Sequence, residues 1–121
     1  MSSTSQFKPS LALGLKERRQ AYSVYIVDDS SIDRTFLKRL LVKQGFEIAG
    51  EASNGEDAIK SLKQLLDSPP DIFFVDQEMP YMSGTETILR LKRLFPEAKI
   101  IMISAYSSKE LVRKVLELKI H

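Results

Sequence analysis

The feature that most constrains the fold is a set of three short segments in which every residue is apolar. They are Val24-Tyr25-Ile26-Val27, Ile72-Phe73-Phe74-Val75 and Ile100-Ile101-Met102-Ile103. Each has the length of a strand and is rich in β-branched and aromatic residues. A strand with one face in water would alternate apolar and polar residues, and these do not. We therefore expect strands of a parallel sheet that helices cover on both faces.

The segments between these strands carry apolar residues at helical spacing. Ser30 and Ser31 are good N-caps for a helix that ends at Gly45. Residues 46–52 alternate, with some irregularity, between apolar and polar side chains, which suits a strand near a sheet edge. Ser53-Asn54-Gly55 is typical of a turn. Further helices are predicted within 58–66, over 85–95 and around 111–116. Strand then helix, repeated four times, predicts a doubly wound α/β fold.

The chain divides into an N-terminal extension, residues 1–22, and one domain, residues 23–121. Residues 1–10 are Ser-rich and read as a flexible leader, and residues 11–22 have a loose helical spacing that Gly14 interrupts. The extension has four basic residues against one acidic residue, a net charge of +3. A solvated tail explains this charge better than a contact surface for an acidic partner.

Several classes of function are excluded or disfavoured by composition. The chain has no cysteine, and its single histidine is His121, so disulfides, thiolate chemistry and His-based sites are excluded. There is no P-loop, and no Gly-rich dinucleotide motif after the first strand. No apolar run is long enough to span a membrane. A net charge of +2 gives no reason to expect nucleic-acid binding. We expect a cytoplasmic protein.

Polar residues that could carry chemistry follow the apolar strands directly. Asp28 and Asp29 follow the first strand, Asp76 follows the third, and Ser104 follows the fourth. In parallel α/β sheets, ligands bind outside the carboxyl ends of the strands. The three carboxylates meet there if the first and third strands are neighbours. An isolated Asp pair is usually a loop or capping feature, but three aspartates that each end an apolar strand favour a site. Ser104 is as well explained by a strand-end turn.

Three clustered carboxylates repel one another unless a cation lies between them. Mg²⁺ is suited to this set because it takes oxygen ligands, keeps several waters, and typically binds one or two carboxylates. A carboxylate in such a place can also attack phosphorus and form an acyl phosphate. The residues therefore indicate a magnesium site in which one of the carboxylates is placed to accept a phosphoryl group.

These motifs together resemble the receiver domain of two-component response regulators, of the chemotaxis-regulator type. The resemblance runs in order from about Ser23 to His121. It rests on the acidic pair of Tyr25-Ile26-Val27-Asp28-Asp29-Ser30, on Asp76-Gln77-Glu78-Met79-Pro80 with Gly84, and on Ile101-Met102-Ile103-Ser104-Ala105.

The resemblance implies a flavodoxin-like sheet of order 2-1-3-4-5 and a role in phosphorelay signal transduction. Asp76 would accept the phosphoryl group from a histidine kinase or phosphotransfer protein. Asp29 and Asp76 would bind Mg²⁺ by their side chains, Glu78 by its backbone carbonyl, and Asp28 mainly through water. Ser104 would be the switch hydroxyl. The resemblance implies a signalling module, not an enzyme.

The family pattern also includes a fifth strand with a phosphate-binding lysine and a fifth helix, which would fall beyond His121. We therefore expect an order of 2-1-3-4 and impaired phosphorylation, and self-association through the exposed edge of the fourth strand. The alternative function is a receiver-like interaction module that is not phosphorylated. A metal-dependent phosphatase fits less well, because no acid/base pair supplements the carboxylates.

Overall fold

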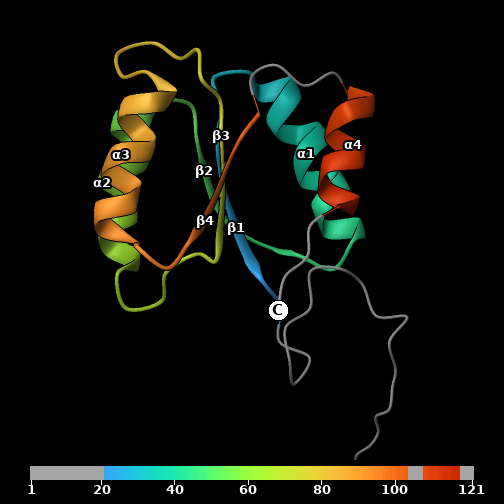
Figure 1. Ribbon diagram of the computed structural model, residues 1–121, viewed down its shortest axis with the longest axis horizontal. Coiled ribbons are helices and arrows are strands. Elements are labelled where there is room, and N and C mark those ends of the chain that lie inside the picture. Colours follow the sequence, from blue (N-terminus) through green and yellow to red (C-terminus); the bar gives the residue numbers. More distant parts are fainter. Residues whose placement is uncertain (1–20, 104–107, 118–121) are drawn as a thin grey trace, which may run out of the picture.

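The computed structural model describes residues 21–103 and 108–117. Its strands are β1 (Ser23–Val27), β2 (Glu47–Ala52), β3 (Ile72–Val75) and β4 (Lys99–Met102), and its helices are α1 (Ser31–Lys43), α2 (Gly55–Leu62), α3 (Gly84–Leu94) and α4 (Ser108–Leu116). The strands form one parallel sheet in the order β2-β1-β3-β4. Helices α1 and α4 cover one face, and α2 and α3 cover the other (Figure 1). The predicted fold and strand order are confirmed.

Short polar side chains start the helices that follow β1, β2 and β3. The side chain of Ser30 accepts the backbone N–H of Asp33, and Asn54 and Ser83 do the same for α2 and α3. Each cap satisfies a donor that the first helical turn leaves unpaired. The predicted Asn54 turn is thus the start of a helix. At the other end of α1, Gly45 has φ of 90°, a conformation that favours glycine and ends the helix as predicted.

Successive residues of the apolar strands point to opposite faces of the sheet and build two cores. In β3, Ile72 and Phe74 belong to the core under α1 and α4, while Phe73 and Val75 belong to the core under α2 and α3. All four are at most 1% exposed. Burial on both faces is why these strands read as continuous apolar runs.

The two edge strands are less buried than the central pair. Residues of β2 alternate between exposed and half-buried, as predicted for an edge. In β4 only Ile101 is buried, so the continuous apolar run of this strand does not mean burial like that of β1 and β3, and its exposure fits the expected sheet edge. The reason is position: β4 pairs with β3 alone in the part of the chain that the structure describes. The helix predicted within 58–66 also differs, since α2 ends at Leu62 and a 3₁₀ turn follows over Lys63–Leu65.

The chain enters the sheet in an extended conformation. The predicted helix over residues 11–22 lies outside the described residues except for Ala21 and Tyr22, and these two are not helical. The carbonyl of Tyr22 accepts the N–H of Glu47, which begins the β1–β2 pairing. Among the helices described, none has both the length and the apolar character that a membrane span requires.

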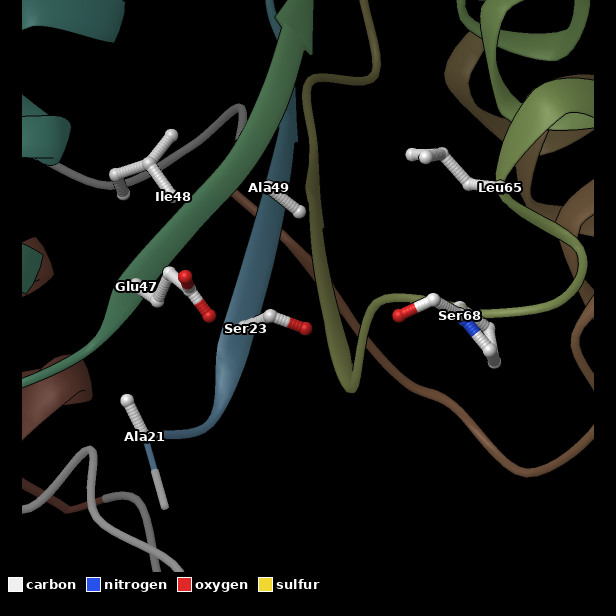
Figure 2. Close-up of a pocket in the computed structure, with 8 residues that line it drawn as sticks. Ala21, Ser23, Glu47, Ile48, Ala49, Leu65 and Ser68 are labelled. Atoms are coloured by element: carbon white, nitrogen blue, oxygen red, sulfur yellow. The ribbon is translucent and has the colours of Figure 1, made fainter.

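A pocket of about 750 Å³ lies at the amino ends of β1 and β2. Figure 2 shows Ser23 and Glu47 from these strands on one side, and Leu65 and Ser68 on the other. The predicted site residues Asp28, Asp29 and Asp76 follow the carboxyl ends of β1 and β3. This pocket therefore lies at the opposite end of the sheet from them.

Candidate functional site

The three aspartates meet because β1 and β3 are parallel neighbours that end at the same level. Val27 is the register partner of Val75, and the N–H of Asp76 donates to the carbonyl of Val27 at 2.8 Å. The residues that follow both strands therefore leave the sheet side by side. One carboxylate oxygen from each of Asp28, Asp29 and Asp76 lies within 4.8 Å of the others. The sequence predicted that these three carboxylates lie close together, and the structure confirms it.

The three carboxyl groups differ in their contact with solvent. Asp28 is 4% exposed, Asp76 is half-buried and Asp29 is exposed. Burial raises the pKa of Asp28 to about 6; the N–H of Ser30 opposes this rise, and the charge of Asp76 adds to it. Burial also raises the pKa of Asp76, and the charge of Asp29 adds to that rise, while the N–H of Glu78 opposes it. Repulsion and desolvation thus act together on this cluster.

No described lysine or arginine forms an ion pair with these three aspartates. The ion pairs of residues 21–103 and 108–117 join Arg34 and Lys38 to Glu51, and Arg90 to Glu86. The cluster is therefore a set of hard oxygen donors with excess negative charge. This donor set fits Mg²⁺, which takes carboxylate and carbonyl oxygens and keeps part of its water shell.

The loop between β3 and α3 is packed tightly beneath Asp76. A Cβ at Gly84 would lie 2.4 Å from the carbonyl oxygen of Asp76, so the backbone leaves room only for glycine. The N–H of Gly84 donates to the carbonyl of Gln77 at 2.9 Å. Glu78 is exposed, and its N–H approaches Oδ1 of Asp76 at 3.4 Å. Gly84 and Glu78 therefore both lie against Asp76.

The predicted switch residue Ser104 and its neighbour Ala105 lie outside the described residues. The last residue described before them is Ile103, whose N–H donates to the carbonyl of Val75 at 2.9 Å. Val75 directly precedes Asp76, so β4 ends at the edge of the sheet that carries the aspartates. The role of Ser104 stays a prediction.

Two further charged residues act on the site and were not predicted from the sequence. Arg34 donates from Nη1 to the carbonyl oxygen of Asp28, and from Nε to Glu51 of β2. Asp33 adds to the negative charge that raises the pKa of Asp28. Both lie in the first half of α1, where charged residues are ordinary on a solvated helix face. Nothing in the sequence pattern separates Arg34 from the other basic residues of this helix.

The pKa of Asp28 predicts a pH dependence of stability in the metal-free protein. The folded chain holds this proton with a pKa of about 6, against an ordinary value of 3.8. The free energy of unfolding therefore falls as pH rises from about 4 to about 6 through this group. Asp28→Asn removes the charge and keeps an acceptor for Ser30. We expect it to raise the free energy of unfolding by about 2 to 3 kcal/mol at pH 7, and not at pH 4.

Denaturant unfolding with a chelator present, at pH 4 and pH 7, measures this difference. Asp67→Asn is the control, because Asp67 is an exposed loop carboxylate. Equal stability of Asp28→Asn and wild type at pH 7 would show that the buried charge carries no cost.

Comparison with known proteins agrees with this geometry. A sequence model of the response regulator receiver domain matches residues 24–121. Chemotaxis protein CheY of Thermotoga maritima is 39% identical over 94 residues, 78% of this chain and 76% of that protein. CheY of Bacillus subtilis is 37% identical over 92 residues, 76% of this chain and 74% of that protein.

A chain in the crystal structure of the CheX–CheY–BeF₃–Mg²⁺ complex from Borrelia burgdorferi superposes with a TM-score of 0.71. It is 31% identical, and the match covers 85% of this chain and 77% of that chain. The strand order, the acidic cluster and these relatives agree. This chain belongs to the response regulator receiver domain family of two-component signalling, and it is of the CheY-like type.

Proposed function

We propose that this receiver domain accepts a phosphoryl group on Asp76, with Mg²⁺ bound beside it. The ion is held by the side chains of Asp29 and Asp76 and the backbone carbonyl of Glu78, and Asp28 acts mainly through water. The donor is a histidine kinase or a phosphotransfer protein. Ser104 is the hydroxyl that responds to the phosphorylated state.

The observation that carries this proposal is the cluster of three carboxylates at the ends of β1 and β3. Their oxygens lie within 4.8 Å of one another, and no described cation pairs with them. Burial, with repulsion inside the cluster adding to it, raises the pKa values of Asp28 and Asp76, and their ionised forms therefore cost stability. A bound divalent cation relieves that cost. The relatives support the same function, since one of them was crystallised as a complex with BeF₃ and Mg²⁺.

The chain's own residues define the chemical step. A carboxylate oxygen of Asp76 attacks the phosphorus of the donor, and an O–P bond forms. The bond from phosphorus to the donor breaks, and its electron pair leaves with the donor. Asp76 then carries an acyl phosphate. Asp76 is half-buried, so a donor can reach it while the close approach of Gly84 fixes its backbone. When bound, Mg²⁺ would neutralise negative charge on the transferred group.

Replacing Asp29 by Asn should abolish Mg²⁺ binding, because a charged ligand is replaced by a neutral one. Glu78→Gln is the matched control, since it removes a carboxylate from the same rim and keeps the backbone carbonyl. We expect its affinity to stay near that of wild type. Titration followed by isothermal calorimetry or NMR measures both. Wild-type affinity in Asp29→Asn would show that the ion binds elsewhere.

Incubation with acetyl phosphate and Mg²⁺ should add the mass of one phosphoryl group to the chain, as measured by intact mass spectrometry. Asp76→Asn should remove this product, and Asp67→Asn should leave it unchanged. We expect labelling to be slow, because the charged side chains that act on Asp76, those of Asp29 and Glu78, are acidic and repel an anionic donor. Arg34 is already engaged with Glu51 and with the turn after β1.

Three outcomes of this experiment would contradict part or all of the proposal. Labelling that survives Asp76→Asn would place the acceptor on another residue. Binding of Mg²⁺ without any labelling, by acetyl phosphate or by a phosphorylated histidine protein, would favour the alternative function, a receiver-like interaction module. Fast labelling in the absence of Mg²⁺ would show that another cation reaches the site.

We also propose that the outer edge of β4 mediates self-association. The N–H groups of Lys99 and Ile103 donate to the loop before β3 and to β3. By alternation, the N–H groups of Ile100 and Met102 face away from β3, and no strand among residues 21–103 and 108–117 pairs with that side. Free strand edges recruit other strands.

Light scattering over a concentration series should therefore show association of the 121-residue polypeptide. Met102→Pro removes an outward N–H without removing a bond to β3, and it should shift the protein toward monomer. A wild-type monomer at the highest concentration would refute this proposal.

A further inference from the structure

Arg34 connects three parts of the molecule near the acidic cluster. Its Nε donates to Oε1 of Glu51 in β2 at 2.8 Å, and its Nη1 donates to the carbonyl oxygen of Asp28. The side chain is only 17% exposed, so the guanidinium sits largely out of water between these two acceptors. One side chain of α1 thus holds the edge strand and the turn that follows β1.

The turn that Arg34 contacts carries two of the three aspartates. Its first residue, Asp28, is fixed at other atoms too. The N–H of Asp28 donates to the carbonyl of Ala52 at 3.0 Å, and Oδ1 of Asp28 accepts the N–H of Ser30 at 2.9 Å. The bond from Arg34 fixes the carbonyl oxygen of the same residue. Its backbone N–H, its side chain and its carbonyl are therefore held by three different groups.

The carbonyl of Asp28 matters because it belongs to the peptide plane that leads into Asp29. The peptide unit is planar, so the carbonyl oxygen of Asp28 and the N–H of Asp29 turn together. A bond that holds this oxygen sets the orientation of the plane, and with it the direction in which the side chain of Asp29 leaves the backbone. Asp29 itself is exposed and has little packing to hold it.

The other partner of Arg34 is also held in place. Glu51 lies opposite Ile26 of β1 in the parallel register. Its second oxygen, Oε2, accepts from Nζ of Lys38. Lys38 and Arg34 are four residues apart on one face of α1. The carboxylate of Glu51 therefore spans two basic groups, and only Arg34 continues from it to the turn.

We propose that Arg34 is a positioning residue of the magnesium site. It orients the peptide between Asp28 and Asp29, so that the carboxylate of Asp29 stands beside that of Asp76. This inference rests on the proposed function, and it adds a residue outside the acidic cluster on which metal affinity depends.

Charge alone makes the opposite prediction for the same residue. A guanidinium close to a cation site repels the cation, so its removal would tighten Mg²⁺ binding if electrostatics were its main effect. Removal would weaken binding if Arg34 acts by orienting the turn. The sign of the change in affinity therefore separates the two effects.

The test is a Mg²⁺ titration of Arg34→Gln and Lys38→Gln at one ionic strength. Each variant removes one of the two basic side chains that contact the carboxylate of Glu51. Only Arg34→Gln also removes the hydrogen bond to the carbonyl of Asp28. We expect Arg34→Gln to bind Mg²⁺ about tenfold more weakly, in the range seen when a partner of a metal ligand is lost. Lys38→Gln should bind as wild type or slightly more tightly. Arg34→Lys keeps the positive charge but lacks the planar guanidinium, so its Mg²⁺ affinity should lie between those of wild type and Arg34→Gln.

A second readout uses the metal-free protein. The backbone amide resonances of Asp29 and Ser30 should shift and broaden in Arg34→Gln, and stay in place in Lys38→Gln. If wild type itself binds no Mg²⁺, the proposed function fails, and these resonances still decide whether Arg34 orients the turn. Unchanged resonances, or Mg²⁺ binding by Arg34→Gln as tight as that of wild type, would overturn the inference. If Arg34→Gln does not fold, the same comparison is made with Arg34→Lys.

Discussion

The parallel pairing of β1 with β3 is the contact on which the rest of this structure depends. Val27 and Val75 are register partners, and the N–H of Asp76 donates to the carbonyl of Val27. Both strands are buried on both faces, so neither can slip without exposing apolar side chains. Because the strands end together, the residues after them must leave the sheet together. The acidic cluster is a direct consequence of this register.

The three aspartates lie close together although burial and the repulsion between their charges oppose this arrangement. Burial and mutual repulsion raise the pKa values of Asp28 and Asp76, and the described cations pair elsewhere. What holds the aspartates close is backbone geometry: bonds between strands, a capped helix after β1, and the close approach of Gly84 to Asp76. Stability is lost at the point where a cation would gain affinity, as is usual for functional sites.

Much of this could be predicted from local sequence signals. Continuous apolar runs indicated the buried strands, Ser30 and Gly45 bounded α1, and the alternation of residues 46–52 placed β2 at an edge. The three aspartates were recognisable because each follows an apolar strand. The exposed edge of β4 was expected from the order 2-1-3-4, but the apolar pattern of this strand did not show how little of it is buried. The 3₁₀ turn after Leu62 was missed for a similar reason, because apolar spacing continues through it.

The sequence by itself determined the layers of the fold, the strand ends that carry the carboxylates, and the family. These depend on periodicity, capping and short motifs, which are properties of neighbouring residues. Only the tertiary structure decided how buried Asp28 is, how far its pKa rises, and which basic residue reaches it. Arg34, Glu51 and Asp28 lie on a helix, an edge strand and a turn, and only the packing of α1 against β2 brings them into contact. Such a contact has no local sequence signal, because it depends on how the elements meet.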